Sequence, residues 1–345
     1  MKRPSIAIVG AGVAGLACAR RLAEAHLDVR LFDKGRSPGG RLATRRAETP
    51  LGEARFDHGA QHISVRDSTF ARMMEDFASA GVAALWKFDD GLARPNVPSR
   101  SPQRRWVGTP GMSAIARRMA EGLAVETSSR ATGFRTDGAR WRLEVNHAGQ
   151  SHSENEGPFD AVVVALPAEQ AAPLLAPVAP GLAAEAAAAR TAPCWAGLFT
   201  FDRRFEAPFE VRRFGAGEAL AWVARDTSKP GRTGPEAWVV HASPAWSRAQ
   251  LDLTSEGASD ALWRMFSDLA PEAPQPIWLQ AHRWRYALVE TPASSRFSWD
   301  PVLRLGVCGD WRMGPRVEAA WLSGDGLGAA MRTAFDQSTR DSIGA

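Results

Sequence analysis

Three glycines near the start of the chain have the spacing of a phosphate-binding turn. Gly10, Gly12 and Gly15 follow a wholly apolar run, residues 6–9, and precede a helical pattern over about residues 16–25. Such a run is typical of a buried parallel strand. The first glycine permits a tight bend, the second lets a pyrophosphate approach the backbone, and the third lets the helix pack closely on the strand. The free N–H groups and positive end of the helix then favour phosphate.

An acidic residue ends the next predicted strand, residues 28–32. Asp33 lies 18 residues after Gly15, where a carboxylate can accept hydrogen bonds from a ribose. A glycine-rich loop follows and ends in Arg41, whose planar guanidinium suits bidentate contact with phosphate. Strand, glycines, helix, strand and terminal acid together predict a dinucleotide site.

A dense polar cluster, residues 57–62, comes after this loop. Because the cluster follows a predicted cofactor loop, Gln61 and His62 are candidates to contact a ring system. Apolar side chains then recur at spacings of three and four over residues 67–88, which predicts a helix. The Pro-, Ser- and Arg-rich stretch 94–110 predicts a crossing loop.

The character of the chain changes in its middle part. Residues 113–122 predict a helix, residues 130–145 an antiparallel meander, and residues 159–167 a buried strand that leaves the first domain. From about residue 168 to 296, strand-like runs alternate with proline- and glycine-rich turns, with one clear helix near residues 259–269. We therefore expect a second domain built on an antiparallel sheet.

The chain then returns to the first domain. Residues 303–308 predict a strand, Gly309 and Asp310 follow it, and another helix begins near Val317. A simple nicotinamide-binding domain does not need a turn and helix so far downstream. FAD does need them, because its ribityl and flavin ends lie far from the adenosine site.

These patterns predict an α/β fold, α+β overall, with two domains. A discontinuous Rossmann-like FAD-binding domain takes residues 1–66, 100–167 and 297–340. A substrate domain with an antiparallel sheet takes residues 67–99 and 168–296.

The composition is that of an ordinary soluble protein. The chain has 345 residues, of which 45% are hydrophobic and 23% are charged, enough for a large core and two domains. The longest apolar region, about residues 161–189, is broken by four prolines, so no membrane span is expected. Cys18, Cys194 and Cys308 lie far apart, so we expect no metal site, redox dithiol or disulfide framework, and a cytoplasmic location.

The basic residues are mostly arginine. Only four of the 42 basic residues are lysine, and the net charge is +4. The arginine side chain suits contacts with phosphate and carboxylate groups. The sequence has no basic block interleaved with aromatic residues, so we do not expect a nucleic-acid partner. The amino-terminal residues imitate a signal peptide, yet the glycines at functional spacing favour a segment that is kept and folded.

These segments together resemble the flavin amine oxidase superfamily. The superfamily likeness rests on residues 10–15 with Asp33, residues 39–41, residues 111–113 before a helix, and Gly309-Asp310 with residues 318–320. Within the superfamily, the chain resembles bacterial renalases at residues 57–62, 105–115, 241–242, 246–247, 281–284, 307–311 and 316–324. The likeness runs in compatible order from about residue 5 to 335.

The resemblance implies a non-covalently bound FAD and an activity. That activity is oxidation of isomeric 2- or 6-dihydro forms of NAD(P) to NAD(P)+, with molecular oxygen reduced to hydrogen peroxide. The partners are then a small dinucleotide substrate and oxygen, with nothing to indicate oligomeric state. Carried over by position, the resemblance assigns cofactor contacts to Gly10, Gly12, Ala14, Gly15, Asp33, Lys34, Arg41, Gln61, His62, Val125, Gly309, Asp310, Val317 and Ala319.

Some of these assignments carry specific roles. Val125 is expected at the adenine edge through its backbone, and Val317 and Ala319 are expected to point N–H groups at the N1/O2 edge of the flavin. Residue 62 departs from the family pattern, because it is His where we expect Tyr; Tyr286 is the chain's single tyrosine.

The chemistry expected at this site needs no side-chain acid or base, since hydride transfer is the property of the flavin. No catalytic side chain is therefore predicted. Glu318 is better explained as a first-turn carboxylate favoured by the helix dipole than as a catalytic group. The substrate candidates are His241, His282, Trp284 and Trp321, and for each of them core packing or a structural hydrogen bond is an equal alternative.

Two other functions remain open. The first is an amine oxidase acting on a small amine. Such an enzyme commonly uses a lysine near flavin N5 and a pair of aromatic residues, often tyrosines. This arrangement is hard to assemble here, because the chain has only four lysines and one tyrosine. A non-catalytic binding protein of the same fold would bind no flavin or lack the glycine and acid pattern. A disulfide reductase is excluded because there is no Cys-x-x-Cys.

Overall fold

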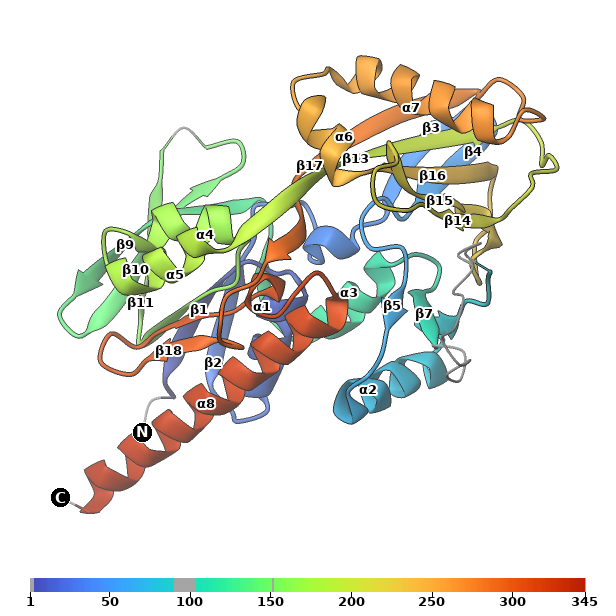
Figure 1. The fold of residues 1–345 in the computed structure, drawn as a ribbon. Helices are drawn as coiled ribbons and strands as arrows, with labels where there is room; N and C mark the ends of the chain where they lie inside the picture. The colour runs from blue at the N-terminus through green and yellow to red at the C-terminus, as the bar shows by residue number, and fades with distance from the viewer. Residues whose placement is uncertain (1–2, 90–103, 151, 345) are drawn as a thin grey trace. The chain divides into compact units, whose positions relative to one another are not determined.

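The structure is a computed structural model that describes residues 3–89, 104–150 and 152–344 (Figure 1). The chain forms two compact units. Unit 1 consists of Met1–Gly40, Ala116–Thr191 and Val289–Ala345, and unit 2 of Arg41–Ile115 and Ala192–Leu288. No helix among the described residues is long and apolar enough to cross a membrane.

Unit 1 is built on a six-stranded sheet with the order β18-β19-β12-β1-β2-β8. Its strands are β1 (Ser5–Val9), β2 (Asp28–Phe32), β8 (Ala124–Glu126), β12 (Ala161–Val164), β18 (Ser298–Asp300) and β19 (Leu305–Val307). All are parallel except β18, which runs antiparallel to β19. The strand order reverses between β1 and β12, and ligands of such sheets bind at this switch point, outside the carboxyl ends of the strands.

Helices α1 (Val13–Ala23) and α8 (Val317–Gly344) pack against each other in unit 1. The contact is very close, because a Cβ atom added to Gly324 of α8 would lie 1.9 Å from the carbonyl oxygen of Ala14. Arg20 of α1 donates to the last carbonyls of α3 (Ser113–Ala120), at 2.7 Å to Met119 O and 3.0 Å to Arg118 O. A cation at a helix C-terminus satisfies orphan carbonyls and opposes the negative end of the dipole.

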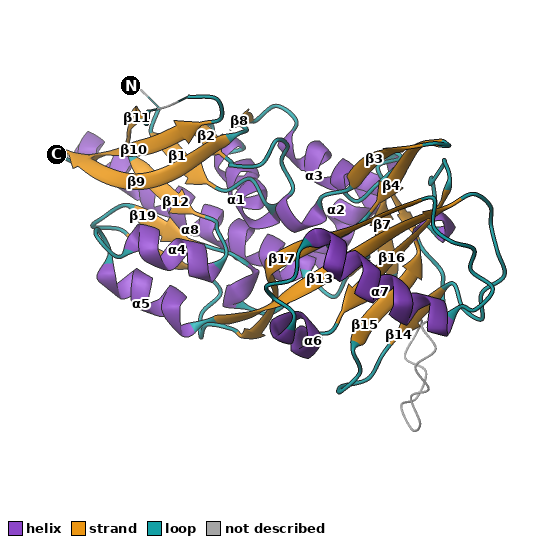
Figure 2. Ribbon diagram, turned by 90° about the horizontal axis from the view of Figure 1, so that it is seen from above, coloured by secondary structure: helices purple, strands orange, loops and turns teal. Residues whose placement is uncertain are grey.

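A three-stranded antiparallel sheet, in the order β11-β10-β9, packs with the parallel sheet of unit 1 (Figure 2). Its strands are β9 (Ser129–Asp137), β10 (Arg140–His147) and β11 (Glu154–Phe159). Phe134 and Trp141 of this sheet share one core with Val162 of β12 and with alternate residues of β1. Helices α4 (Ala168–Leu175) and α5 (Pro180–Ala188) complete that core.

Unit 2 is built on a five-stranded sheet with the order β14-β15-β16-β13-β17. Its strands are β13 (Arg190–Phe201), β14 (Val211–Arg213), β15 (Leu220–Arg225), β16 (Glu236–Ala242) and β17 (Trp278–Thr291). Side chains of β16 alternate between two cores, as the two-residue period of a strand requires. Trp238 packs with Phe266 of α7 (Ser255–Leu269), near α6 (Pro244–Ala249), and Val239 packs with Phe56 on the other face.

Smaller elements complete unit 2. Phe56 belongs to a hairpin formed by β3 (Arg45–Thr49) and β4 (Gly52–Phe56). A second small sheet contains β5 (Ile63–Ser64), β6 (Ala83–Leu85) and β7 (Arg105–Gly108), and α2 (Ser68–Ser79) precedes β6. Asp67 caps α2 by accepting from Thr69 N and Phe70 N, which satisfies two of the unpaired N–H groups of its first turn.

The expected combination of a Rossmann-like parallel sheet and an antiparallel sheet is confirmed. Two local predictions are wrong. The helix predicted over residues 67–88 ends at Ser79, because Gly81 adopts a φ of +72° and β6 follows. In the loop predicted over 94–110, Arg105–Gly108 forms β7, and residues 94–103 lie outside the described residues.

The compact units also divide the chain at other points than the predicted domains. Residues 41–66 group with unit 2. The β3–β4 hairpin accounts for this, because Phe56 stacks on Trp278 with ring centroids 5.4 Å apart.

Candidate functional site

The glycine turn lies at the carboxyl end of β1, as predicted. Gly10 has a φ of +104°, and its N–H donates to Phe32 O at 2.8 Å. A Cβ at Gly15 would lie 1.9 Å from the carbonyl oxygen of Gly10, so only glycine allows helix and strand to approach this closely. Gly12 caps α1, and a Cβ there would meet nothing within 4 Å. The turn therefore presents open space before a helix N-terminus, which suits a phosphate group.

Asp33 and a second glycine pair lie beside this turn. The two carboxylate oxygens of Asp33 accept from Ala11 N at 2.6 Å and from Gly35 N at 2.7 Å. Because an ionised carboxylate has about four acceptor positions, two remain for other donors such as ribose hydroxyls. Gly39 N donates to Ala11 O at 2.9 Å, and Gly39 forms an isolated bridge with Gly12. The structure thus brings the two glycine-rich segments together.

Val125 and Lys34 occupy the same region of unit 1. Val125 lies in β8, directly opposite Leu31 of β2. Lys34 follows Asp33, and its ammonium donates to Gln170 Oε1 at 3.1 Å. Burial lowers the pKa of Lys34, and the nearby positive charge of Arg130 lowers it further.

The second predicted contact region of unit 1 lies at the carboxyl end of β19. Gly309 N donates to Ser323 Oγ of α8 at 3.0 Å, and Asp310 is buried. Helix α8 begins at Val317, where the sequence predicts, and Ala319 is buried in its first turn. Glu318 is also buried and accepts from Arg316 at 3.0 Å.

The two contact regions of unit 1 share one edge of the sheet. β1 and β19 are both parallel to β12, so Gly10 and Gly309 follow the same ends of their strands. Ser323 binds Gly309, and its neighbour Gly324 contacts Ala14 at the start of α1. Helix α8 therefore connects the glycine turn with the Gly-Asp turn, as a long ligand spanning both would require.

Unit 2 holds the predicted residues Arg41, Gln61 and His62. Arg41 donates to Ala287 O at 3.0 Å. Gln61 is buried, whereas His62 is partly exposed and packs against the rings of Trp222 and Phe88, with centroids at 5.5 and 5.7 Å. His62 therefore contacts aromatic side chains, and its contact with a cofactor ring stays a prediction.

Three of the four predicted substrate residues gather in unit 2 around a residue for which no role was predicted. The carbonyl oxygen of His58 accepts from Trp284 Nε1 at 2.9 Å and from His241 Nε2 at 3.1 Å. The rings of His282 and Trp284 lie 4.4 Å apart, and both contact the His58 ring. We call His58, His241, His282 and Trp284 the histidine–tryptophan group. The fourth predicted residue, Trp321, lies buried on α8 in unit 1.

The imidazoles of this group are held neutral. Burial lowers the pKa of His58 to about 3, with a further contribution from His282 and His241. Burial lowers the pKa of His241 to about 4. Burial also lowers the pKa of His282, and the positive charge of Arg45 adds to this. The group therefore offers uncharged aromatic surface near a cation.

Next to this group lies a cluster of four buried charges that the sequence did not reveal. We call Asp57, Asp226, Lys229 and Arg232 the charge quartet. Lys229 Nζ lies 3.1 Å from Asp57 Oδ2 and also binds Asp226, and Arg232 pairs with Asp57. Their side chains are at most 2% exposed. The only sequence feature that sets Lys229 apart is that lysine is rare in this arginine-rich chain, and rarity does not predict burial.

The quartet also fixes neighbouring backbone. Asp57 Oδ1 accepts from Met112 N at 2.9 Å and from Thr44 Oγ1 at 2.7 Å. Burial by itself raises the pKa of a carboxyl group, but the charges of Lys229 and Arg232 outweigh it and lower the pKa of Asp57 to about 2. Burial raises the pKa of Asp226. Asp57 accepts from both backbone and side chain here, so it joins several loops of unit 2.

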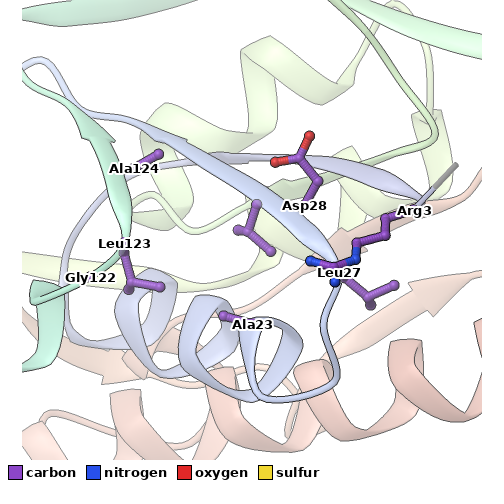
Figure 3. A pocket seen from close by; sticks show the side chains of 8 residues that line it. Arg3, Ala23, Leu27, Asp28, Gly122, Leu123 and Ala124 are labelled. Carbon is purple, nitrogen blue, oxygen red and sulfur yellow. The ribbon is translucent and has the colours of Figure 1, made fainter.

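Two other features of unit 1 lie apart from these residues. A pocket of about 460 Å³ is lined by Arg3, Asp28 and Gly122, among others, at the amino ends of β2 and β8 (Figure 3). It is therefore at the edge opposite the glycine turn. Glu126 and Glu156 approach His147 with metal-ligand spacing, but Arg30 already pairs with both carboxylates.

Comparisons with known proteins agree with this fold. Residues 8–77 match an NAD(P)-binding Rossmann-like domain, and residues 83–326, more than half of the chain, match flavin containing amine oxidoreductase. A putative protoporphyrinogen oxidase from Exiguobacterium sp. 255-15 has a TM-score of 0.73 at 12% identity, covering 96% of this chain and 99% of that one.

Two amine oxidases have similar folds. Cyclohexylamine oxidase from Brevibacterium oxydans IH-35A gives a TM-score of 0.70 at 12% identity, covering 97% of this chain and 100% of that one. A redesigned putrescine oxidase gives 0.65 at 13% identity, covering 95% and 99%. At these identities the likeness concerns the fold, whereas the family match extends over most of the sequence. The chain therefore belongs to the flavin-containing amine oxidoreductase family, a family of FAD-dependent enzymes.

Proposed function

We propose that the protein is a renalase-type oxidase that removes a hydride from 2- or 6-dihydro-NAD(P) and yields NAD(P)+. The two electrons pass to molecular oxygen, which takes up protons and leaves as hydrogen peroxide. The proposal rests on the sequence resemblance together with the chemistry of the histidine–tryptophan group. The family and fold alone do not distinguish it from oxidation of an amine.

FAD, bound without a covalent link, supplies the hydride acceptor at its flavin N5. In the proposal, the open face of Gly12, the α1 N-terminus and Asp33 hold its adenosine diphosphate half. Gly309, Asp310 and the first turn of α8 hold the ribityl and flavin end. The remaining residues assigned to FAD are Gly10, Ala14, Gly15, Lys34, Arg41, Gln61, His62, Val125, Val317 and Ala319.

The observation that carries the proposal is the close approach of the His58, His282 and Trp284 rings, whose centroids lie 4.4–4.9 Å apart, at a place where burial lowers the pKa of both imidazoles. A dihydronicotinamide ring is flat and uncharged, so it gains from stacking on neutral aromatic surface. The cation of Arg45 is close enough to lower the pKa of His282. It would attract the phosphates of a dinucleotide and oppose a protonated amine.

The lysines of unit 2 support the same choice. Lys229 is buried, and its ammonium contacts Asp57, Asp226 and Gln61. Three acceptors match the three donors of an ammonium group. Lys229 is therefore a structural cation and not a free amine beside a substrate, and Lys87 is exposed.

The protein's own contribution to hydride transfer is orientation and charge stabilisation. The N–H groups of Val317 and Ala319, in the first turn of α8, would donate to the ring edge on which negative charge develops. A helix N-terminus adds its positive dipole to these hydrogen bonds. No proton has to be removed from the substrate by a side chain.

Oxidation of a small amine is the second candidate. It is favoured by the family description and by the cyclohexylamine and putrescine oxidases that share the fold. A role as a non-catalytic binding protein is the third, and absence of flavin from the purified protein would favour it.

Anaerobic mixing separates these functions. The flavoprotein is mixed with dihydronicotinamide isomers made by borohydride reduction of NAD+ and NADP+, and separately with a panel of amines that includes cyclohexylamine and putrescine. We expect the dihydro isomers to bleach the flavin absorbance and ordinary NADH to be a much poorer reductant. After oxygen is admitted, peroxide should equal the substrate consumed. Bleaching by amines alone would refute the proposal and leave the fold intact.

A further inference from the structure

A buried group of four charges is a costly feature. Moving an ion from water into the interior costs several kcal/mol even after relaxation, and well-packed apolar residues often serve stability as well or better. The charge quartet is complete, with two carboxylates and two cations, and it is buried in unit 2. Its position therefore calls for a reason beyond stability.

The quartet makes one contact with a predicted site residue. Lys229 Nζ lies 3.2 Å from Gln61 Oε1. An ammonium group only donates hydrogen bonds, so this contact fixes the amide oxygen toward Lys229 and the amide nitrogen away from it. The nitrogen then donates to the carbonyl oxygen of Asp57, so both ends of the amide are oriented by quartet residues.

Within the part of the chain that the structure describes, one N–H of this amide is left over. Gln61 Nε2 lies 3.5 Å from His241 Nε2, and His241 Nε2 lies 3.1 Å from the carbonyl oxygen of His58. A carbonyl only accepts, so His241 carries its proton on Nε2 and cannot accept from Gln61. The second N–H of Gln61 therefore has no acceptor in His241.

We propose that Lys229 is a positioning residue that fixes the polarity of Gln61, so that this side chain presents an N–H donor, and not its oxygen, to the flavin. The inference rests on the proposed function, in which Gln61 lies on the flavin side. Without Lys229 only the carbonyl oxygen of Asp57 still orients the amide, so the orientation that turns an N–H toward the flavin is kept less strictly. A donor to a heteroatom that gains electron density stabilises the reduced ring, so losing it should lower the reduction potential.

The test uses the FAD-loaded protein and a charge-balanced variant, Lys229→Met/Asp226→Asn. It removes one cation and one anion and keeps the Asp57–Arg232 pair. The flavin potential is measured by anaerobic equilibration with a reference dye, together with the visible spectrum and the thermal midpoint. We expect a tenfold loss in the equilibrium for flavin reduction, which for a two-electron couple is about 30 mV.

A double-mutant cycle shows whether the effect passes through Gln61. Gln61→Met should lower the potential by itself, and the quartet variant should then add nothing further. Gln61→Glu keeps an acceptor for Lys229 but has no N–H, so it should also lower the potential. Together, Gln61→Met and Gln61→Glu test the placement of Gln61 at the flavin, on which the inference depends, even if the quartet variant does not fold.

A matched control removes another buried ion pair from the same unit. Arg225 pairs with Glu236 at 2.7 Å, with side chains 4% and 7% exposed. Arg225→Met/Glu236→Gln should lower the thermal midpoint and leave the potential unchanged. An equal shift in this control, no shift in the quartet variant, or a shift that persists in the Gln61→Met background would overturn the inference.

Failure of the inference is distinguishable from failure of the proposed function. If Gln61→Met and Gln61→Glu leave the potential unchanged, Gln61 is not at the flavin and the inference falls. The bleaching assay with dihydro isomers decides the proposed function independently of that result.

Discussion

Acid should destabilise the protein through two imidazoles, that of buried His58 and that of partly buried His241. The pKa of His58 is about 3 and that of His241 about 4 in the folded chain, against about 6.5 when unfolded. Both side chains are thus neutral when folded and bind protons on unfolding. Their stabilising contribution is complete above the unfolded pKa and is lost as the pH falls from about 6.5 toward 4.

The size of this effect follows from the linkage relation. At about pH 5 the unfolded state has bound most of one proton at each site and the folded state almost none, so each imidazole costs about 2 kcal/mol relative to pH 7.5. His58 and His241 together should lower the free energy of unfolding by about 4 kcal/mol. That is a large share of the stability of an ordinary domain.

Variants isolate this contribution from that of all other titrating groups. Urea unfolding, followed by tryptophan fluorescence, is compared at the two pH values for the wild type and for His58→Gln/His241→Gln. The double variant should lose about 4 kcal/mol less on acidification. His152→Gln, which alters an exposed imidazole, serves as the control. An equal acid-induced loss in wild type and double variant would refute the reasoning, as would imidazole NMR resonances that titrate near pH 6.5.

Three further predictions concern backbone contacts of unit 1. Gly15→Ala places a Cβ 1.9 Å from a carbonyl oxygen and should prevent stable folding. In Gly12→Ala the new Cβ meets nothing within 4 Å. This second variant should keep the thermal midpoint of the apoprotein but weaken FAD retention in ultrafiltration. Gly324→Ala also meets a carbonyl oxygen at 1.9 Å and should cost about 1–3 kcal/mol or more, measured by urea unfolding; an unchanged midpoint would show that the helices separate easily. Val317→Pro should fold, because proline suits the first helical position, but should slow flavin reduction in stopped flow; unchanged kinetics would count against this placement of α8.

Local patterns allowed the phosphate-binding turn to be predicted from the sequence. Gly10, Gly12, Gly15 and Asp33 lie within a short stretch, and their roles depend on turn and helix geometry that neighbouring residues impose. The start of α8 at Val317 was likewise predictable from its local pattern. Conversely, the β3–β4 hairpin was missed because its strands carry several charged side chains and little apolar alternation.

The charge quartet could not be predicted for a different reason. Asp57 and Lys229 are 172 positions apart, and nothing near either residue indicates that they pair. The histidine–tryptophan group shows the same limit, since His241, His282 and Trp284 were found through family resemblance. His58, which accepts hydrogen bonds from His241 and Trp284, lies in the resembling segment 57–62 but no role was predicted for it. Pairing between charges far apart in the sequence depends on the folded chain, so neither composition nor periodicity predicts it.

The alternation of the chain between its two units has a consequence for synthesis on the ribosome. Central strand β1 pairs on one side with β2, which follows within about one helix, but its other partner begins at Ala161 and the next strand at Leu305. The nascent chain therefore holds an incomplete nucleotide-binding sheet while every segment of unit 2 emerges. Its apolar strands must await β19, so we expect this protein to need chaperone shielding or delayed collapse more than a contiguous Rossmann domain does.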